Sequence, residues 1–447
     1  MIRSINTEKH GNLWNRLARN LIYDSKQLLL YCGIKVPERK EDGHLVDYTD
    51  IVDRVTRGTN YGAIYDSSTR RIHFEPGYIQ EIVDQASRFD FPVYDRSFGP
   101  GGIAGFIQEI RNGEEVLNQP NLNHILHQAM ISKRESMPFS YVSARQMGML
   151  EVEQFGVMTK VFDGPIFLSV MTSQGVDEAE ASIAAGNYII TVHTLFESPL
   201  TLSFQRAADI FNDCVSKQIP VMLVTQPFSG HNAPMTPYGT ALIAFSEFLA
   251  GMAFASAINP ETRVINGALP TLCTPGKTVK LKIGSIVHNF TNYLIAYTSK
   301  LLDIPSIQSG CTMEGNRHEK TILDTDYETV RAMILWLNIF ENWHMLRHCY
   351  GFLNDMRSFS FEKAIDDIAA LRHIQSLDDN GIFAVLANNV KLYNDLKKAN
   401  ELYEEPTRVF NREKEDLLNV VLETIEYFNG DFGRHEHTLK NIPEEWF

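Results

Sequence analysis

The feature that most constrains the fold of this chain is a regular alternation of short apolar runs with longer amphipathic runs, beginning near residue 139. The short runs are rich in β-branched and aromatic residues and are apolar on both faces, which is typical of strands buried in a parallel sheet. The predicted strands are 139–144, 166–171, 188–193, 221–226, 263–268, 306–310 and 347–353. Helices are predicted between them, over 146–161, 175–185, 201–217, 238–257, 281–302 and 321–345.

Strands that alternate with helices predict an α/β fold with a parallel sheet and helical crossovers. The number of repeating units favours a (β/α)8 TIM-type barrel over an open doubly wound sheet. The eighth strand has two candidate positions, 93–106 and the region after residue 374.

The chain is expected to form three regions. Residues 1–90 read as an N-terminal helical cap with a small hairpin at 63–74, and 91–375 as the barrel catalytic domain. Residues 376–447 read as a C-terminal helical extension, clearest over 382–403 and 411–428.

Charge and cysteine content exclude several classes of function. The 41 basic and 55 acidic residues give a net charge of −14, which argues against nucleic-acid binding because phosphate contacts need a basic surface. The 5 cysteines are scattered without a CxxC pair, so neither a disulfide framework nor a cysteine-rich zinc site is expected.

One apolar stretch, 241–258, is nearly long enough to cross a membrane. Glu247 lies inside it, and Pro237 and Pro260 flank it, which indicates a buried helix instead. The N-terminus has no apolar core of signal-peptide length. We therefore expect a cytoplasmic protein with no membrane contact.

In a barrel, the working residues follow the carboxyl ends of the strands. This rule selects Arg145 after the first predicted strand, His193 after the third, and the loop 227–234 with His231 and Asn232 after the fourth. The segment 308–320 after the sixth strand holds the densest set of ionisable and hydrogen-bonding side chains. Its candidates are Gln308, Cys311, Thr312, His318 and Glu319.

Each candidate also has a structural interpretation. His318 and Glu319 could mark an exposed helix start, where the helix dipole favours the acidic residue. His231 could cap its loop, Cys311 could be an inert small residue, and Glu247 could pair with a buried basic residue. His344 and His348 have a spacing that can bind zinc on a helix, but there is no clear third ligand, so no metal site is predicted.

The run 224–271 and several blocks in order around it resemble a known protein family. Within the run the matching elements are Ala233-Pro234, a helical segment 246–251 around Glu247, Asn259-Pro260 and Asn266-Gly267. The further blocks are 32–36, 98–99, 142–145, 304–306, Gly310, 318–321, Gly351, Leu353 and 359–362. On these motifs, roughly residues 20–375 resemble the trimethylamine/glycine-betaine corrinoid protein methyltransferase family.

The resemblance implies a (β/α)8 barrel that moves a methyl group from a methylamine or quaternary amine to the cobalt of a separate corrinoid-binding protein. Some members carry pyrrolysine at the position that aligns with Thr312, so this chain is similar to the non-pyrrolysine branch, whose substrates are quaternary amines such as glycine betaine. The loop is shorter here than in the pyrrolysine members, and 311–314 replaces their Ser-x-x-Asp. A cobalamin or other corrinoid would come with the partner, and no tightly bound cofactor is expected; homo-oligomerisation remains open.

A quaternary cation is commonly bound by aromatic faces, each contributing about 0.5–2 kcal/mol. We therefore assign substrate binding to aromatic and polar side chains near the predicted barrel top. They are Phe98, Tyr141, Arg145, Phe228, His231, Asn232, Gln308, Cys311, Thr312 and Tyr350. The predicted catalytic residues, which could offset the charge of the cation, are Glu247, His318 and Glu319.

Two other classes of function remain open. The chain could be a non-catalytic paralogue or scaffold that keeps the barrel without the site, as the short loop after the sixth strand suggests. It could also be a metal-dependent barrel hydrolase or lyase that uses His193, His231 and His318 as ligands.

Overall fold

The computed structural model describes a large part of the chain, most of it between residues 9 and 377. The described residues are 9–38, 40–41, 44–45, 47–58, 62–86, 96–102, 105–111, 114–143, 151–203, 205–234, 236–274, 280–281, 283–310, 332–353, 356–377 and 381. The predicted helices 382–403 and 411–428 lie outside them, as does the first part, 321–331, of the predicted helix 321–345.

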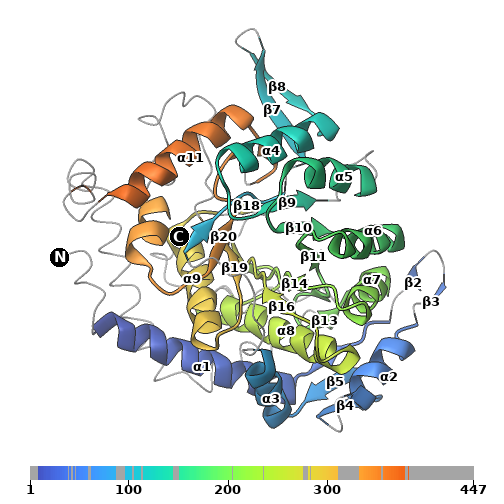
Figure 1. Ribbon diagram of the computed structural model, residues 1–447. Helices are drawn as coiled ribbons and strands as arrows, with labels where there is room; N and C mark the ends of the chain where they lie inside the picture. Colours follow the sequence, from blue (N-terminus) through green and yellow to red (C-terminus); the bar gives the residue numbers. More distant parts are fainter. Residues whose placement is uncertain are drawn as a thin grey trace.

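Parallel strands form the centre of the molecule, in a mixed α/β arrangement (Figure 1). A five-stranded sheet has the order β16-β14-β11-β10-β9, and a three-stranded sheet has the order β19-β20-β6. Every neighbouring pair in the two sheets is parallel. The strands are β6 (Ser97–Phe98), β9 (Ser140–Ser143), β10 (Ile166–Ser169), β11 (Ile189–His193), β14 (Val221–Leu223), β16 (Val264–Asn266), β19 (Ile307–Ser309) and β20 (Met345–Arg347).

The two sheets are joined on one side by a parallel bridge between Asn266 and Ser306, where the Asn266 amide donates to the Pro305 carbonyl at 2.9 Å. On the other side, no strand ladder joins β6 to β9 among the described residues. There the Gln128 side chain donates to the carbonyls of Gly101, at 3.1 Å, and Tyr141, at 2.8 Å. This amide therefore connects the chain after β6 to β9 where no ladder is present.

Helices lie outside the strands and cover the outer face of the sheets (Figure 1). They are α4 (Leu122–Arg134), α5 (Glu151–Val161), α6 (Ser173–Ala184), α7 (Gln205–Ser216), α8 (Pro237–Ile258), α9 (Ile286–Leu301), the π-helix η3 (Leu335–Ile339) and α11 (Phe361–Ser376). Their order between the strands is the one that the sequence predicts for helical crossovers.

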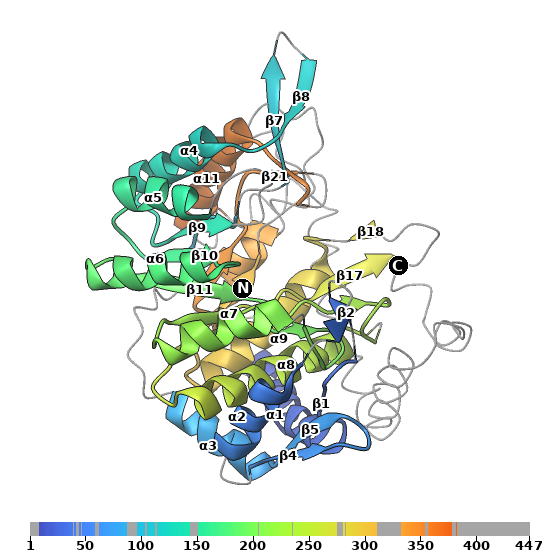
Figure 2. The same cartoon turned by 90° about the vertical axis from the view of Figure 1, so that its right-hand side faces the viewer.

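Short strands beyond the central ones form smaller sheets. Figure 2 shows β7 (Phe106–Arg111) and β8 (Glu114–Asn118) as a hairpin that projects from the body. The others are β12 (Phe196–Glu197), β13 (Thr201–Leu202), β15 (Phe228–Ser229), β17 (Thr271–Thr274), β18 (Lys280–Leu281), β21 (Phe352–Leu353) and β22 (Ser358–Phe359).

The N-terminal region packs on the outside of α8 and α9 through α1 (Lys9–Tyr31). The antiparallel hairpin of β4 (Ala63–Asp66) and β5 (Arg71–Phe74) lies where the sequence predicts one. β1 (Ile34–Lys35) joins this hairpin to β13 through the parallel pair Lys35 and Thr201. The remaining elements are β2 (Lys40–Glu41), β3 (His44–Leu45), α2 (Thr49–Gly58) and α3 (Pro76–Ala86).

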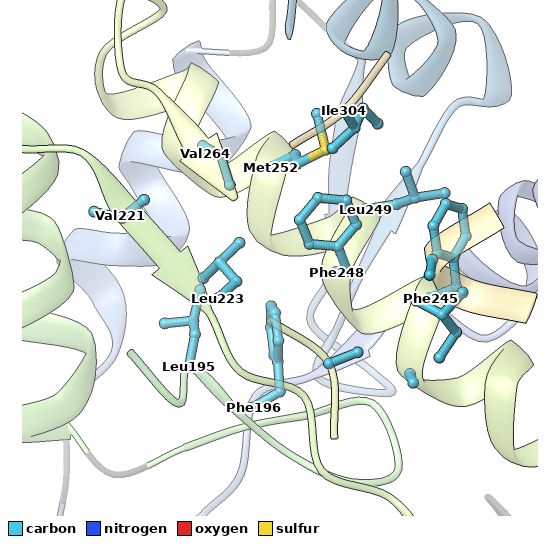
Figure 3. Packing of buried hydrophobic residues seen from close by; sticks show 14 of the residues in the cluster. Leu195, Phe196, Val221, Leu223, Phe245, Phe248, Leu249, Met252, Val264 and Ile304 are labelled. Carbon is cyan, nitrogen blue, oxygen red and sulfur yellow. The ribbon is translucent and has the colours of Figure 1, made fainter. Parts of the chain in front are cut away.

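Helix α8 is the one helix among the described residues that is long and apolar enough to cross a membrane. In this structure 83% of its apolar window is buried inside the protein. Phe248 and Met252 lie in the same packed cluster as Leu223 of β14 and Val264 of β16 (Figure 3). The apolar character of α8 is thus explained by burial between the sheet and the N-terminal helices.

Two strands differ from the sequence prediction. The seventh strand, predicted over 347–353, is β20 at Met345–Arg347. The helix predicted up to residue 345 ends earlier, because the backbone is extended from Phe340. Strand β6, at Ser97–Phe98, falls within the first of the two regions considered for the eighth strand. With two residues it is too short to produce a periodic pattern.

The Gln128 bridge gives a first prediction. Gln128→Leu should leave two buried carbonyls without a donor and lower the free energy of unfolding by about 1–3 kcal/mol. Gln85→Leu, on the outer helix α3, is the matched control and should change it by less than about 0.5 kcal/mol. Urea unfolding of both variants measures this, and equal stabilities would show that the bridge contributes nothing.

Candidate functional site

Arg347 occupies the carboxyl end of β20 and points into the interior enclosed by the parallel strands. Its side chain is buried, with the residue 2% exposed. One terminal nitrogen, Nη2, donates to the carbonyl oxygen of Gly267 at 2.6 Å. Burial lowers the pKa of Arg347, and the Tyr141 hydroxyl, which hydrogen-bonds with the guanidinium, partly offsets this effect. A cation is therefore held at the same edge of the sheet where all the parallel strands end.

Tyr141 brings an aromatic ring to the same place. It lies two residues before the end of β9, and its ring stacks on Phe167 of β10 with 6.1 Å between centroids. Both rings belong to the apolar cluster that fills the interior of the strands. The interior thus offers an apolar, aromatic floor below the Arg347 guanidinium.

His348 and Ser309 complete the polar part of this region. The Nδ1 atom of His348 lies 3.1 Å from the Ser309 hydroxyl. Burial lowers the pKa of His348 well below its usual range, and the nearby charges of Arg347 and His288 lower it further. The imidazole is therefore neutral at physiological pH and can donate or accept one hydrogen bond at each nitrogen according to its tautomer.

Gly101 allows this imidazole to approach the backbone. A Cβ atom at position 101 would lie 1.7 Å from Cδ2 of His348, so no other residue fits there without moving the ring. His348 itself has a backbone φ of 59°, which is uncommon for a residue with a side chain. The neighbouring structure thus fixes the imidazole at a defined position beside Arg347.

The loop 227–234 lies beyond the carboxyl end of β14. Its strand β15 pairs with β17, with Phe228 opposite Thr271. The Asn232 side chain accepts a hydrogen bond from the Phe228 amide at 2.5 Å, which closes the turn. Phe228 is half-buried and His231 is exposed at the tip. Asn232 therefore has a structural role in shaping this loop, and its predicted substrate contact stays a prediction.

Glu247 is fully buried in the middle of α8, and both of its carboxylate oxygens have donors. The Ser198 hydroxyl and the Leu200 amide each donate to it at 2.9 Å. The pairing with a buried basic residue that the sequence analysis considered is not present among the described residues; the donors come from the segment after the third predicted strand, β11. Burial raises the pKa of Glu247 to about 7, although these two hydrogen bonds lower it. Its observed role is to hold the segment 198–200 against α8.

Three predicted substrate contacts face away from the interior. Successive side chains along a strand point to opposite faces, and Ile307 and Met345 point into the interior. Gln308 and Phe98, which both pair with Leu346, therefore point outwards to the helices. Gln308 reaches the Asn266 carbonyl at 3.5 Å on that outer side. Tyr350 packs in the outer core with its hydroxyl near Ser132 of α4. The structure gives no support to substrate binding by these three side chains.

Five predicted site residues lie outside the described residues, and their predicted roles stay predictions. They are Arg145, Cys311, Thr312, His318 and Glu319. Conversely, the sequence analysis missed Arg347, Ser309 and His348 as site residues. The sequence around Arg347 gives only a weak signal of a buried site residue, because His344 and His348 flank it and interrupt the apolar run.

Metal binding gains no support among the described residues, where no group of three potential metal ligands gathers. His193 is buried with its Nε2 atom 2.8 Å from the Thr191 hydroxyl, and burial lowers its pKa to about 3. Its ring packs against Phe211 of α7, whereas His231 is exposed on its loop. His344 and His348 flank a strand, so their spacing does not place them on one helix face.

Comparison with protein families identifies one match. Residues 170–387 match the sequence model of the family described as trimethylamine methyltransferase (MTTB). This segment contains Glu247, Gln308, Arg347 and His348. The match over this segment is consistent with the family that the sequence motifs indicate.

Other comparisons add little. A comparison with curated protein sequences gave no match. Among solved structures, the chain is similar to a dihydropteroate synthase from Vibrio fischeri (14% identity, 63% of this chain and 96% of that one, TM-score 0.34). It is also similar to a truncated 3-deoxy-D-arabino-heptulosonate 7-phosphate synthase from Thermotoga maritima (11% identity, 64% and 88%, TM-score 0.36). Similarities at this level carry no argument about fold or function.

The raised pKa of Glu247 gives the second prediction. The pKa of a glutamate carboxyl group is normally near 4.5, and burial raises that of Glu247 in the folded chain to about 7. Between these two pH values the folded chain therefore binds more protons at this group than the unfolded chain does. Folding stability should therefore fall as the pH rises through this range, by roughly 3 kcal/mol at most. In Glu247→Gln this contribution should disappear. Urea unfolding of both proteins at pH 5 and pH 8 measures it, and parallel pH profiles would contradict the assignment.

Proposed function

We propose that this chain, whose residues 170–387 match the trimethylamine methyltransferase family, transfers a methyl group from a quaternary amine to the Co(I) of a separate corrinoid protein. The family match is the observation that carries the proposal. The fold that we propose with it is a closed (β/α)8 barrel, supported by the bridge between β16 and β19 and by the Gln128 link between β6 and β9. A cytoplasmic location is part of the same proposal.

The proposed reaction needs no general acid or base from this chain. When the methyl carbon of a quaternary ammonium is attacked, the C–N bonding pair stays with nitrogen and a neutral tertiary amine leaves, so no proton has to move. The corrinoid of the partner supplies the nucleophile when it is bound. The tasks of this chain are to hold the donor, to orient its methyl group and to exclude water.

The described interior suits these tasks. Tyr141 brings an aromatic ring beside the Arg347 guanidinium, and such a ring attracts a quaternary cation through the negative potential of its face. The surrounding cluster of apolar side chains, which includes Val192 and Met222, fills the interior of the strands and would exclude water from below a donor bound at their carboxyl ends. The carboxyl ends of the strands form the entrance through which the donor would reach this floor.

The proposed reaction also limits where the corrinoid protein would dock. The cobalt must come within bonding distance of the donor's methyl group, so the partner has to approach the carboxyl ends of the parallel strands. The loop 227–234 and the strand pair of β15 and β17 lie at this edge among the described residues. We place the partner's docking face there.

The proposal predicts a specific methyl-transfer activity. The purified chain should accelerate methylation of Co(I) corrinoid protein by a quaternary amine, followed by the change in cobalt absorbance. With trimethylamine, whose leaving group is not activated, the rate should equal that without the chain. Acceleration with trimethylamine alone would contradict the predicted substrate class.

The two alternative functions predict different results in the same methylation assay. A non-catalytic paralogue would bind the corrinoid protein without accelerating methylation by any amine. A metal-dependent hydrolase would lose its activity on treatment with a chelator, whereas methyl transfer by the mechanism proposed here would be unaffected by removal of metal ions from this chain.

A further inference from the structure

The hairpin of β7 and β8 carries two large apolar side chains that the structure leaves exposed. Leu117 of β8 is 57% exposed, and Phe106 of β7 is 42% exposed. The hairpin extends past α4, away from the body of the molecule (Figures 1 and 2). Single apolar side chains on a surface are ordinary, whereas a group of them on one projection is typical of a surface that contacts another molecule.

Both side chains lie on the face of the hairpin that is turned away from α4. Leu117 pairs with Gln108, and Phe106 precedes Gln108 by two residues on the same strand, so all three side chains share one face. Glu109 is on the opposite face, where its Oε1 atom lies 3.6 Å from Nε2 of His124 in α4. The hairpin therefore turns the face of Glu109 towards α4 and its exposed apolar side chains away from it.

The base of the hairpin is fixed by contacts on both of its strands. β7 continues the sheet of β21 and β22 through the parallel pair of Phe106 and Ser358. The Ser358 hydroxyl donates to the Gln108 side chain at 3.4 Å. Across the hairpin, the Asn118 side chain donates to Glu109 at 3.0 Å. These contacts hold the hairpin in place, so a partner can bind it with little loss of conformational entropy.

The hairpin belongs to the edge at which the parallel strands end. β7 and β8 lie between the carboxyl end of β6 and α4, and β22 follows the carboxyl end of β20. In the strand order, β14 and β6 are separated by β11, β10 and β9 in one direction and by β16, β19 and β20 in the other. The loop 227–234 after β14 and the hairpin after β6 therefore border this edge on opposite sides.

We propose that the hairpin of β7 and β8 is a contact arm for the corrinoid protein, with Leu117 and Phe106 as its apolar contacts. This inference rests on the proposed function, which requires the partner to lie across the carboxyl ends of the strands. A protein in that position has the loop 227–234 on one side and the hairpin on the other, so it covers both. Burial of the two exposed side chains against the partner is favourable because it removes apolar surface from water.

Biolayer interferometry of the full chain with the cobalamin-loaded corrinoid protein of the methylation assay tests this contact without methyl transfer. Leu117→Asp should raise the Kd at least about tenfold, because the new charge loses its water on binding and the apolar contact is lost. Ile64→Asp is the matched control. Ile64 is also 57% exposed and also lies in an antiparallel hairpin, on β4 of the N-terminal region, and the variant should keep the parent Kd. Parent affinity in Leu117→Asp, or no binding by the unmodified chain, would overturn the inference.

Methyl-transfer kinetics give a second readout. In Leu117→Asp the KM for the corrinoid protein should rise by a similar factor, whereas kcat at saturating corrinoid protein and the Kd for tetramethylammonium should stay at the parent values. A lower kcat with an unchanged KM would contradict a docking role. Leu117→Ser, which removes the apolar group without adding a charge, should weaken binding by a smaller factor and decides the question if Leu117→Asp does not fold.

A second copy of this chain is the competing occupant of the hairpin. Sedimentation velocity should show the same oligomeric state for the unmodified chain and for Leu117→Asp. Dissociation of an oligomer by this substitution would assign the hairpin to contacts between copies and overturn the proposal.

The inference and the proposed function can fail separately. Methyl transfer by Leu117→Asp with the parent KM would remove the hairpin contact and leave the proposed methyltransferase in place. Binding of the corrinoid protein that depends on Leu117, with no methyl transfer from any quaternary amine, would keep the contact and remove the proposed activity.

Discussion

Parallel pairing of the strands is the constraint on which the site depends, because it brings the carboxyl ends of distant segments to one edge. Tyr141, Gly267 and Arg347 are far apart in the sequence, yet they meet through a hydroxyl, a carbonyl and a guanidinium. No local motif could assemble such a set. The hydrogen bonds of Arg347 in turn tie β20 to β16 and β9, so these contacts also connect the two parallel sheets.

The order of strands and helices could be predicted from the sequence, because burial on both faces gives each central strand a continuous apolar run. The position of Arg347 could not. The predicted strand 347–353 places it at the amino end, whereas β20 ends on it. A displacement of a few residues along a parallel strand moves a side chain from one edge of the sheet to the other. Apolar periodicity does not fix strand ends that closely.

Uncertainty about strand ends and about side-chain direction also explains which site residues the sequence predicts correctly and which it does not. Tyr141 was found because it is an aromatic residue near the end of a clear strand. Gln308 was selected from a similar position, but the alternation of side chains turns it outwards towards α9, where it contacts the Asn266 carbonyl. Glu247 was selected as a charge in an apolar helix. Its donors, Ser198 and Leu200, come from a segment whose fold the sequence pattern does not reveal.

The central claim is that the proposed methyl donor binds at the carboxyl ends of the parallel strands, with its cation against an aromatic side chain. A crystal structure of the full chain with tetramethylammonium, which carries the reacting group of the proposed donors, tests it most directly. The cation should lie at this edge of the sheets, against the ring of Tyr141. A cation bound at another place in the fold would contradict the claim.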